Sequence, residues 1–206
     1  KNNWLSIKHG AFQYYHSNAN KDGEGYFQFD KAEGTFTKYF DNGKKQFEGE
    51  YKNGKRTGTW MYYYSSGKTK EERKYVSDDD YLVMNSWLED GKQQVKDGNG
   101  LYAFYTVENK KLREGNLKEG RENGEWILWN HDGWKEHLVN FSNGKKEGKC
   151  INYFQNGKVK SEGMYYSDKK KGLWKFYEED GKLVIEGNLK DDMQHGKWTY
   201  WFKTGK

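Results

Sequence analysis

The stretch Gly58-Thr59-Trp60-Met61-Tyr62-Tyr63-Tyr64-Ser65-Ser66-Gly67-Lys68 contains the first half of a unit that recurs along the whole chain. A glycine opens this unit, aromatic residues usually follow two and five positions later, and a glycine-lysine turn usually comes nine positions later. Self-similarity at a fixed period of roughly 20 to 50 residues indicates a repeat architecture. The opening glycine recurs every 24 residues within two blocks, as Gly10, Gly34 and Gly58 and as Gly100, Gly124, Gly148, Gly172 and Gly196.

The second half of the unit is equally regular. It reads Glu-Gly-x-Tyr or Glu-Gly-x-Leu, as in Glu48-Gly49-Glu50-Tyr51 and Glu186-Gly187-Asn188-Leu189. A second turn then closes the unit, and its clearest copies are Asn53-Gly54 and Asn143-Gly144. Asn-Gly between two strand-like runs is a strong hairpin signal, because both residues accept a positive φ. Each unit is therefore predicted to contain two strands and two turns.

The period breaks once, between Gly58 and Gly100. A shortened unit fills this gap if Leu82 stands for the missing glycine, which places Met84 and Trp87 at the aromatic positions. We therefore predict a single repeat domain over residues 1–206. Its units begin near residues 10, 34, 58, 82, 100, 124, 148, 172 and 196, of which the unit at 82 is short and degenerate and the unit at 196 is incomplete.

The composition predicts a core made of aromatic rather than aliphatic side chains. Apolar residues make up 33% of the chain, and Phe, Tyr and Trp alone make up 18%. The 25 glycines and the absence of proline fit strands and tight turns, and no window shows helical periodicity or an apolar run of membrane-spanning length. A lone hairpin is marginally stable, so the units must stack. We predict an all-β fold, an elongated antiparallel β-meander of tandem 24-residue β-hairpin repeats.

The two regular aromatic positions cannot share one face of a strictly alternating strand, because they lie three residues apart. Either the strand bends or bulges between them, or both faces of the sheet carry rings. We favour the bend, which would let a strongly coiled sheet wrap around a narrow aromatic core.

The segments Gly58-Thr59-Trp60, Gly67-Lys68 and Glu162-Gly163-x-Tyr165, with Tyr63 and the Asn-Gly-Lys turns, resemble the MORN-repeat family. They are most similar to its bacterial variant, found in YwqK-like proteins that are often labelled antitoxin-type. The resemblance covers essentially the whole chain. It implies an elongated antiparallel β-meander used for protein contacts and, in some eukaryotic members, for membrane association.

Candidate metal-binding residues have simpler structural explanations. The five histidines do not cluster, although His131 and His137 flank a turn and could face each other across a hairpin. The acidic run Asp78 to Asp80 lacks the alternation with glycine of a calcium loop, so we interpret it as a solvated loop. We therefore predict no metal site and no cofactor.

Candidate catalytic residues are explained in the same way. Carboxylate catalysis needs one special pair, whereas a glutamate recurs along this chain, so we expect it to accept hydrogen bonds from turn amides or to pair with lysine of the neighbouring unit. Cys150 stands at an aromatic position and is expected to be a small buried residue, and the glycines spaced by 24 are interpreted as turn glycines rather than phosphate cradles. We predict no catalytic residue and no enzyme activity. The recurring glutamates are Glu48, Glu72, Glu114, Glu162 and Glu186.

The best candidates for partner binding are rings four and six positions after the opening glycine. The residue type varies between units at these positions, and exposed rings beside charges are typical of recognition surfaces. The alternative is that these rings complete the core of a fold poor in aliphatic residues. The predicted partner-binding residues are Tyr14, Tyr62, Tyr64, Phe104, Phe154, Phe176, Tyr200 and Phe202.

A repeat array offers a long surface suited to extended partners, so we predict a non-catalytic protein–protein interaction or scaffolding module whose partner is another protein. The alternatives are a cell-surface carbohydrate- or choline-binding module, with a glycan partner, and a module that binds an anionic membrane surface through turns such as Lys169-Lys170-Lys171. The net charge is only +5 and the charges are interspersed, so no nucleic acid partner is expected.

The chain begins at Lys1 without methionine and without a signal-like apolar stretch, so we expect a trimmed or mature fragment. We expect a bacterial protein, for which a place outside the cytoplasm or at the cell surface is favoured over the cytoplasm.

Overall fold

A computed structural model describes residues 7–106 and 108–202 of the chain. The regular structure in this part of the chain consists of 17 β-strands, and no helix in it could span a membrane. The strands are β1 (Gly10–Tyr15), β2 (Lys21–Gln28), β3 (Lys31–Tyr39), β4 (Lys45–Lys52), β5 (Lys55–Tyr63), β6 (Thr69–Ser77), β7 (Asp80–Trp87), β8 (Gln93–Lys96), β9 (Asn99–Tyr105), β10 (Lys111–Lys118), β11 (Arg121–Trp129), β12 (Lys135–Ser142), β13 (Lys145–Tyr153), β14 (Val159–Tyr166), β15 (Lys169–Tyr177), β16 (Leu183–Lys190) and β17 (Met193–Tyr200).

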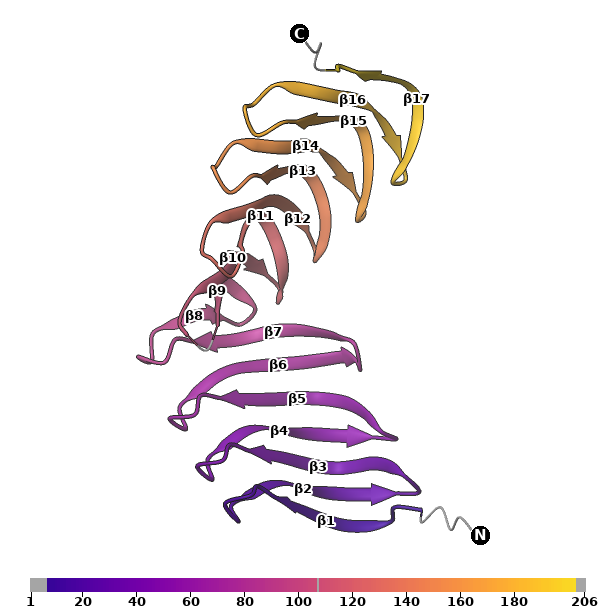
Figure 1. The fold of residues 1–206 in the computed structure, drawn as a ribbon. Helices are drawn as coiled ribbons and strands as arrows, with labels where there is room; N and C mark the ends of the chain where they lie inside the picture. The colour runs from indigo at the N-terminus through magenta and orange to yellow at the C-terminus, as the bar shows by residue number, and fades with distance from the viewer. Residues whose placement is uncertain (1–6, 107, 203–206) are drawn as a thin grey trace, which may run out of the picture. The chain divides into compact units, whose positions relative to one another are not determined.

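The strands pair antiparallel with their neighbours in the chain (Figure 1). Contacts divide the chain into two compact units, Lys1–Gly100 and Leu101–Lys206. In the first unit, β1 to β8 pair in chain order and β8 pairs with the start of β9. In the second unit, β10 to β17 pair in chain order. The predicted all-β antiparallel meander of hairpins is confirmed.

In most units the second turn is a two-residue hairpin turn in which both residues have a positive φ. Asn53 and Gly54 have φ values of 53° and 79°, and Asn143 and Gly144 have values of 49° and 78°. The mirror-image turn type that these angles define matches the right-handed twist of the flanking strands. The turns predicted from the Asn-Gly pairs are therefore confirmed.

Each of these two turns is hydrogen-bonded to the hairpin before it. The acceptor is a carbonyl near the start of β3 or of β11. The amide of Gly54 donates to the carbonyl of Ala32 at 2.8 Å, and the amide of Gly144 donates to the carbonyl of Glu122 at 2.9 Å. An aspartate can add a second bond, since Oδ1 of Asp168 accepts from the amide of Lys146 at 2.8 Å. The hairpins are thus fastened to one another along this edge of the sheet.

The opposite edge is fastened by side chains of the first turn. Nδ2 of Asn42 donates to the carbonyl of Ser65 at 2.8 Å, and Nδ2 of Asn156 donates to the carbonyl of Glu179 at 3.1 Å. Each bond spans 23 residues, about one repeat. Stacking of successive units therefore uses polar contacts at both turn edges in addition to the strand ladder.

The core lies on one face of the sheet, here called the aromatic face, which carries Trp60, Trp126 and Trp174. These three side chains are at most 1% exposed. Each indole lies directly over a glycine of the preceding strand, and a Cβ atom added to that glycine would overlap the ring. The pairs are Gly49 with Trp60, Gly115 with Trp126, Gly163 with Trp174 and Gly187 with Trp198.

The glycine that opens each unit has a different task. Gly124 has a φ of 75° and lies within β11, where the register with β10 shifts opposite it. No atom lies within 4 Å of the Cβ position of Gly124, so its backbone conformation, and not a lack of space, requires glycine. The expectation that glycines spaced by 24 residues are turn glycines is therefore wrong for this position, which is a bulge within a strand.

One unit exchanges the glycine and the tryptophan together. Val139 stands at the glycine position of β12, and Cys150 stands opposite it at the tryptophan position of β13. Their side chains are 4% and 5% exposed, which confirms Cys150 as a small buried residue. The side chains of Val139 and Cys150 thus fill together the space that, in other units, is filled by an indole ring lying over a glycine.

The core is charged where the repeat is interrupted. Arg73 stands at the glycine position of β6, and its guanidinium lies 4.3 Å from the ring centroids of both Tyr62 and Tyr81. It donates a hydrogen bond to Glu71, which is 2% exposed. Val83 lies opposite Arg73 and is 7% exposed. Met84 was expected at the aromatic position of this unit. Because the register shifts between Glu72 and Arg73, Val83 occupies that position instead.

The two regular aromatic positions prove to lie on both faces of the sheet. The register shifts opposite Tyr62 and Tyr63, but the extra residue is Lys70 of β6, so β5 keeps its alternation from Trp60 to Tyr63. The hydroxyl of Tyr63 donates to Glu48, whose side chain points away from the tryptophans. The favoured bend between the two rings is therefore wrong, and the alternative that both faces carry rings is the one observed.

Because Val139 and Cys150 share one space, their substitutions should be coupled. We expect Cys150→Trp to lower the free energy of unfolding by about 1 to 3 kcal/mol through overpacking against Val139. We expect Val139→Gly combined with Cys150→Trp to recover at least part of this loss, since it recreates the Gly115–Trp126 arrangement. Urea unfolding of the two single variants and the double variant measures the coupling. Additive effects would contradict the shared-space explanation.

Candidate functional site

The predicted partner-binding rings four positions after the opening glycine lie on the aromatic face. Tyr14 packs against Phe12 with ring centroids 4.9 Å apart, and Tyr62 packs against Phe47 at 5.8 Å. Phe176 lies between Trp174 and Trp198, at 6.3 Å from each, and Tyr200 lies 6.5 Å from Trp198. Phe104 is half-buried at the same position of β9. These rings continue the row of aromatic contacts that forms the core.

The predicted rings six positions after the opening glycine lie instead at or just beyond the ends of their strands. Tyr64 and Phe154 are half-buried at the first turns of their hairpins, and the hydroxyl of Tyr64 donates to the carbonyl of Trp87 at 2.8 Å. Phe202 follows the last strand and is 84% exposed. The structure therefore does not bring the eight predicted residues together on one surface.

Exposure of the predicted rings depends on their place along the chain. Tyr14 is 47% exposed and Tyr200 is 46% exposed, and they lie on β1 and β17, each of which pairs with one strand among the described residues. Tyr62 is covered on both sides, and its hydroxyl lies 2.8 Å from the hydroxyl of Tyr75. Burial and this contact raise the pKa of Tyr62. The inner rings of the set are thus integrated into the core, as the alternative interpretation of the sequence proposed.

The other face of the sheet, here called the glutamate face, carries the recurring glutamates. Glu48 accepts a hydrogen bond from the hydroxyl of Tyr63 at 2.6 Å and forms an ion pair with Lys45 at 2.6 Å. Glu24 contacts Tyr39 and Lys21 in the same way, at 2.5 and 2.8 Å. The lysine belongs to the same strand as its glutamate, and the partner in the neighbouring unit is a tyrosine for Glu48 and Glu162 and Asn85 for Glu72. For these glutamates the expected pairing with a turn amide or with a lysine of the neighbouring unit is therefore wrong.

This contact changes the ionisation of both groups. Burial raises the pKa of the Glu48 carboxyl, but the hydrogen bonds from Lys45 and Tyr63 outweigh burial and leave it below its ordinary value of 4.5. Burial and the hydrogen bond to Glu48 raise the pKa of Tyr63 to about 12. The carboxylate is thus held ionised and the phenol neutral, which suits a structural contact between units.

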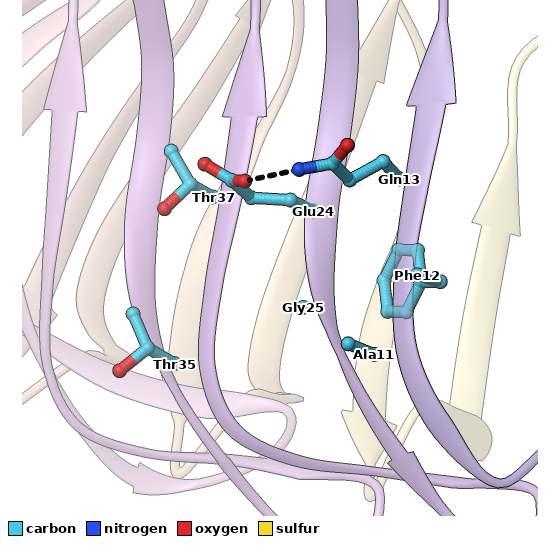
Figure 2. A pocket seen from close by; sticks show the side chains of 7 residues that line it. All are labelled: Ala11, Phe12, Gln13, Glu24, Gly25, Thr35 and Thr37. Carbon is cyan, nitrogen blue, oxygen red and sulfur yellow. Dashed lines mark hydrogen bonds between the residues drawn. The ribbon is translucent and has the colours of Figure 1, made fainter.

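A shallow groove of about 600 Å³ lies on the glutamate face of β1 to β3 (Figure 2). Nε2 of Gln13 donates to Oε2 of Glu24 at 3.3 Å within it. The hydrogen bonds from Lys21 and Tyr39 hold the pKa of Glu24 below its usual value. The groove offers hydroxyl and amide groups to a polar ligand, but its one carboxylate already has three donors. Its lining residues are Ala11, Phe12, Gln13, Glu24, Gly25, Thr35 and Thr37.

The candidate metal-binding and nucleophilic residues have structural contacts. Nδ1 of His137 lies 2.6 Å from Oδ1 of Asn152, and Oδ1 of Asp78 accepts from the amide of Arg56 at 2.9 Å. Within residues 7–106 and 108–202, no group of three or more His, Cys, Asp or Glu side chains is placed to hold a metal ion. Burial raises the pKa of the Cys150 thiol, which disfavours the reactive thiolate.

A surface that the sequence did not single out lies on the glutamate face of β13 to β15. Met164 follows Gly163, and Leu173 precedes Trp174, so both side chains point away from the aromatic face. Met164, Tyr166 and Leu173 are 39%, 46% and 47% exposed. We call these three residues the apolar strip. The sequence shows that Met164 and Tyr166 differ from the polar residues at the same positions of most other units, but it does not show which face they occupy.

Comparison with known proteins finds a family match in four segments. Residues 32–53, 56–77, 146–168 and 170–191 match the family described as MORN repeat variant. Each segment covers most of one pair of adjacent strands, for example β3 and β4. MORN repeats are generally associated with binding and scaffolding, and the family is generally non-enzymatic.

No curated protein matches the sequence. A solved structure described as "Crystal Structure of TcdB2-TccC3-Cdc42" is similar over 89% of this chain, with 13% sequence identity and a TM-score of 0.18. This chain spans only 12% of the length of that chain. Similarity at this TM-score supports no inference about function.

The placement of the rings leads to a stability prediction. We expect Tyr62→Ala to lower the free energy of unfolding by about 2 kcal/mol or more, because it removes a ring packed against Phe47 and Arg73. Phe202→Ala should change it by less than about 0.5 kcal/mol, because Phe202 is 84% exposed. Thermal unfolding of both variants checks this, and equal losses would show that the exposed ring also packs in solution.

The contact between Glu48 and Tyr63 predicts a dependence on pH. The pKa of Glu48 is lowered in the folded chain, so its stabilisation is present above the ordinary value of 4.5 and is lost as the pH falls below it. We expect Glu48→Gln to flatten this acid loss, and Tyr63→Phe to cost about 1 kcal/mol at neutral pH. Urea unfolding between acid and neutral pH gives the curves, and parallel curves for wild type and Glu48→Gln would refute the assignment.

Proposed function

We propose that this chain is a non-catalytic module that binds another protein through the glutamate face of its repeats. The observation that carries the proposal is the apolar strip of Met164, Tyr166 and Leu173, which no described residue covers sufficiently to bury. Exposed apolar side chains that lie together, rimmed by charged residues, are typical of interaction surfaces.

The other repeats support this interpretation of the strip. The position of Met164 is occupied by Glu50, Asn116 and Asn188 in other units, and all three of these side chains are exposed. The same backbone therefore folds with a polar residue at this point. Because folding does not require methionine there, we interpret its exposed apolar surface as serving contact with a partner.

The proposal also draws on the four matches to the MORN repeat variant. We further propose that this chain is a bacterial, YwqK-like, antitoxin-type member of this family. The support is the Glu-Gly-x-Tyr half of the unit and the Asn-Gly-Lys turns. Among the rings predicted to bind a partner, Tyr14, Tyr200 and Phe202 are exposed, but Tyr14 and Tyr200 lie on the aromatic face and are therefore not part of the proposed surface.

Affinity capture tests the proposal. The whole chain is immobilised, incubated with protein extract from its source cells and treated with an amine-reactive cross-linker, and retained proteins are identified by mass spectrometry. We expect one protein to be enriched on the wild type and lost from Met164→Ser combined with Leu173→Ser, because the variant removes the apolar contact.

Val76→Ser is the matched control. Val76 occupies the same repeat position as Tyr166 but lies on β6, and it is 60% exposed. Both variants are first shown to unfold at the temperature of the wild type. Retention of glycans or lipid vesicles alone would replace the proposal with the carbohydrate or membrane alternatives, and equal capture by both variants would remove the strip from the binding surface.

A further inference from the structure

Lysines surround the apolar strip on the sheet. Met164 of β14 pairs with Lys149 of β13 on one side and with Lys171 of β15 on the other, and Tyr166 pairs with Lys169. All three lysines are exposed. Because neighbouring strands lie about 4.8 Å apart, Lys149 and Lys171 stand roughly 10 Å apart with the methionine between them. We call the strip together with these three lysines the lysine surface.

The charges of these lysines are not compensated within the described part of the chain. None of Lys149, Lys169 and Lys171 forms an ion pair there, whereas Lys21, Lys45 and Lys111 each pair with a glutamate three residues later. Nζ of Lys171 lies over the ring of Tyr166, 5.2 Å from its centroid, so its nearest described partner is an aromatic face and not a carboxylate.

The acidic groups nearby are engaged elsewhere. The segment from Lys145 to Lys175 has nine lysines and three acidic residues. Glu147 accepts from the amide of Ser167 at 2.8 Å, Glu162 accepts from the hydroxyl of Tyr177 at 2.7 Å, and Asp168 accepts from the amide of Lys146 at 2.8 Å. The local excess of positive charge follows from these numbers, and the contacts between hairpins hold the three carboxylates away from the lysines of the strip.

The fold does not require lysine at these points. The position of Lys171, one residue before the opening glycine, holds Glu33, Thr57, Asn123 or Glu147 in other units. The position of Lys149, one residue after it, holds Thr35, Thr59 or Glu125 in three other units and Lys197 in the last. The combination of Lys149, Met164 and Lys171 therefore brings cationic and apolar residues together at positions that are mostly polar or acidic elsewhere.

We infer that the lysine surface binds an acidic, extended segment of a partner protein. Apolar side chains of the segment lie against Met164 and Leu173, and its carboxylates lie against Lys149, Lys169 and Lys171. The inference rests on the proposed function, of which it names the partner class and the contact residues.

The mixture of side chains favours a peptide over a phosphate surface. An extended peptide presents a side chain to one face every second residue, about 6.8 Å apart, so apolar and acidic groups can alternate over a surface of this size. A lipid headgroup layer or a nucleic acid presents phosphates throughout. Such a layer would have no apolar group for Met164 at the headgroup level.

Direct binding tests the inference with the whole chain. The probe is a fluorescein-labelled peptide of glutamates interspersed with leucines, measured by anisotropy. Comparison probes are the peptide with lysine in place of glutamate, a single-stranded oligonucleotide of equal charge, and phosphatidylcholine vesicles containing phosphatidylserine. We expect the acidic peptide to bind, with affinity that falls as salt rises.

Two pairs of variants locate the site. Lys149→Glu combined with Lys171→Glu should weaken peptide binding about tenfold or more, because attraction becomes repulsion. Lys31→Glu combined with Lys55→Glu makes the same charge change within the compact unit Lys1–Gly100, where both lysines occupy the repeat position of Lys169. This variant should weaken binding less than about twofold, because salt screens distant charges. Met164→Ser combined with Leu173→Ser should weaken binding while leaving its salt dependence unchanged.

Several outcomes would overturn the inference. Equal weakening by the two charge-reversal variants would show nonspecific attraction, and tighter binding of vesicles or oligonucleotide at the same lysines would show a phosphate partner. Capture of a protein that cross-links elsewhere, with no peptide binding here, would reject this inference and leave the proposed function standing. Capture of no protein at all would reject the proposed function itself.

Discussion

The structure depends on the contact between an indole ring and the glycine of the preceding strand. Trp60, Trp126 and Trp174 are almost fully buried, although the contacts that bury them come from the strands of a repeat sheet. A large ring can be covered in this way only if it lies flat against a backbone without a side chain, and Gly49, Gly115 and Gly163 provide that backbone. The glycine and the tryptophan of the next unit therefore form one structural element.

The exceptions to this contact follow the same constraint. Val139 in the glycine position is matched by Cys150 in the ring position, so the occupied volume is redistributed. Arg73 in the glycine position is matched by Val83, and its charge is held by Glu71 and by the faces of two tyrosine rings. This charged arrangement lies in the interrupted part of the repeat, in the half of the chain that ends at Gly100.

The residues on the two faces of the sheet therefore differ in how freely they can change from one repeat unit to the next. On the aromatic face, rings such as Phe176 contact two tryptophans and are constrained by packing. On the glutamate face, Glu48 and Tyr63 link neighbouring units, while the positions nearer the second turn are exposed and differ between units. The apolar strip and its lysines occupy those variable positions, which is why we assign binding to this face and not to the rings chosen from the sequence.

The sequence by itself determined the repeat, the strands and turns, and the aromatic core, because glycine spacing, Asn-Gly turns and ring content are local signals. Only the tertiary structure decided which face each side chain occupies. The sequence left open whether the strand bends between Trp60 and Tyr63, and the structure places them on opposite faces because β5 keeps its alternation there. Lys149 and Lys171 are 22 residues apart in the chain and become neighbours of Met164 through strand pairing alone.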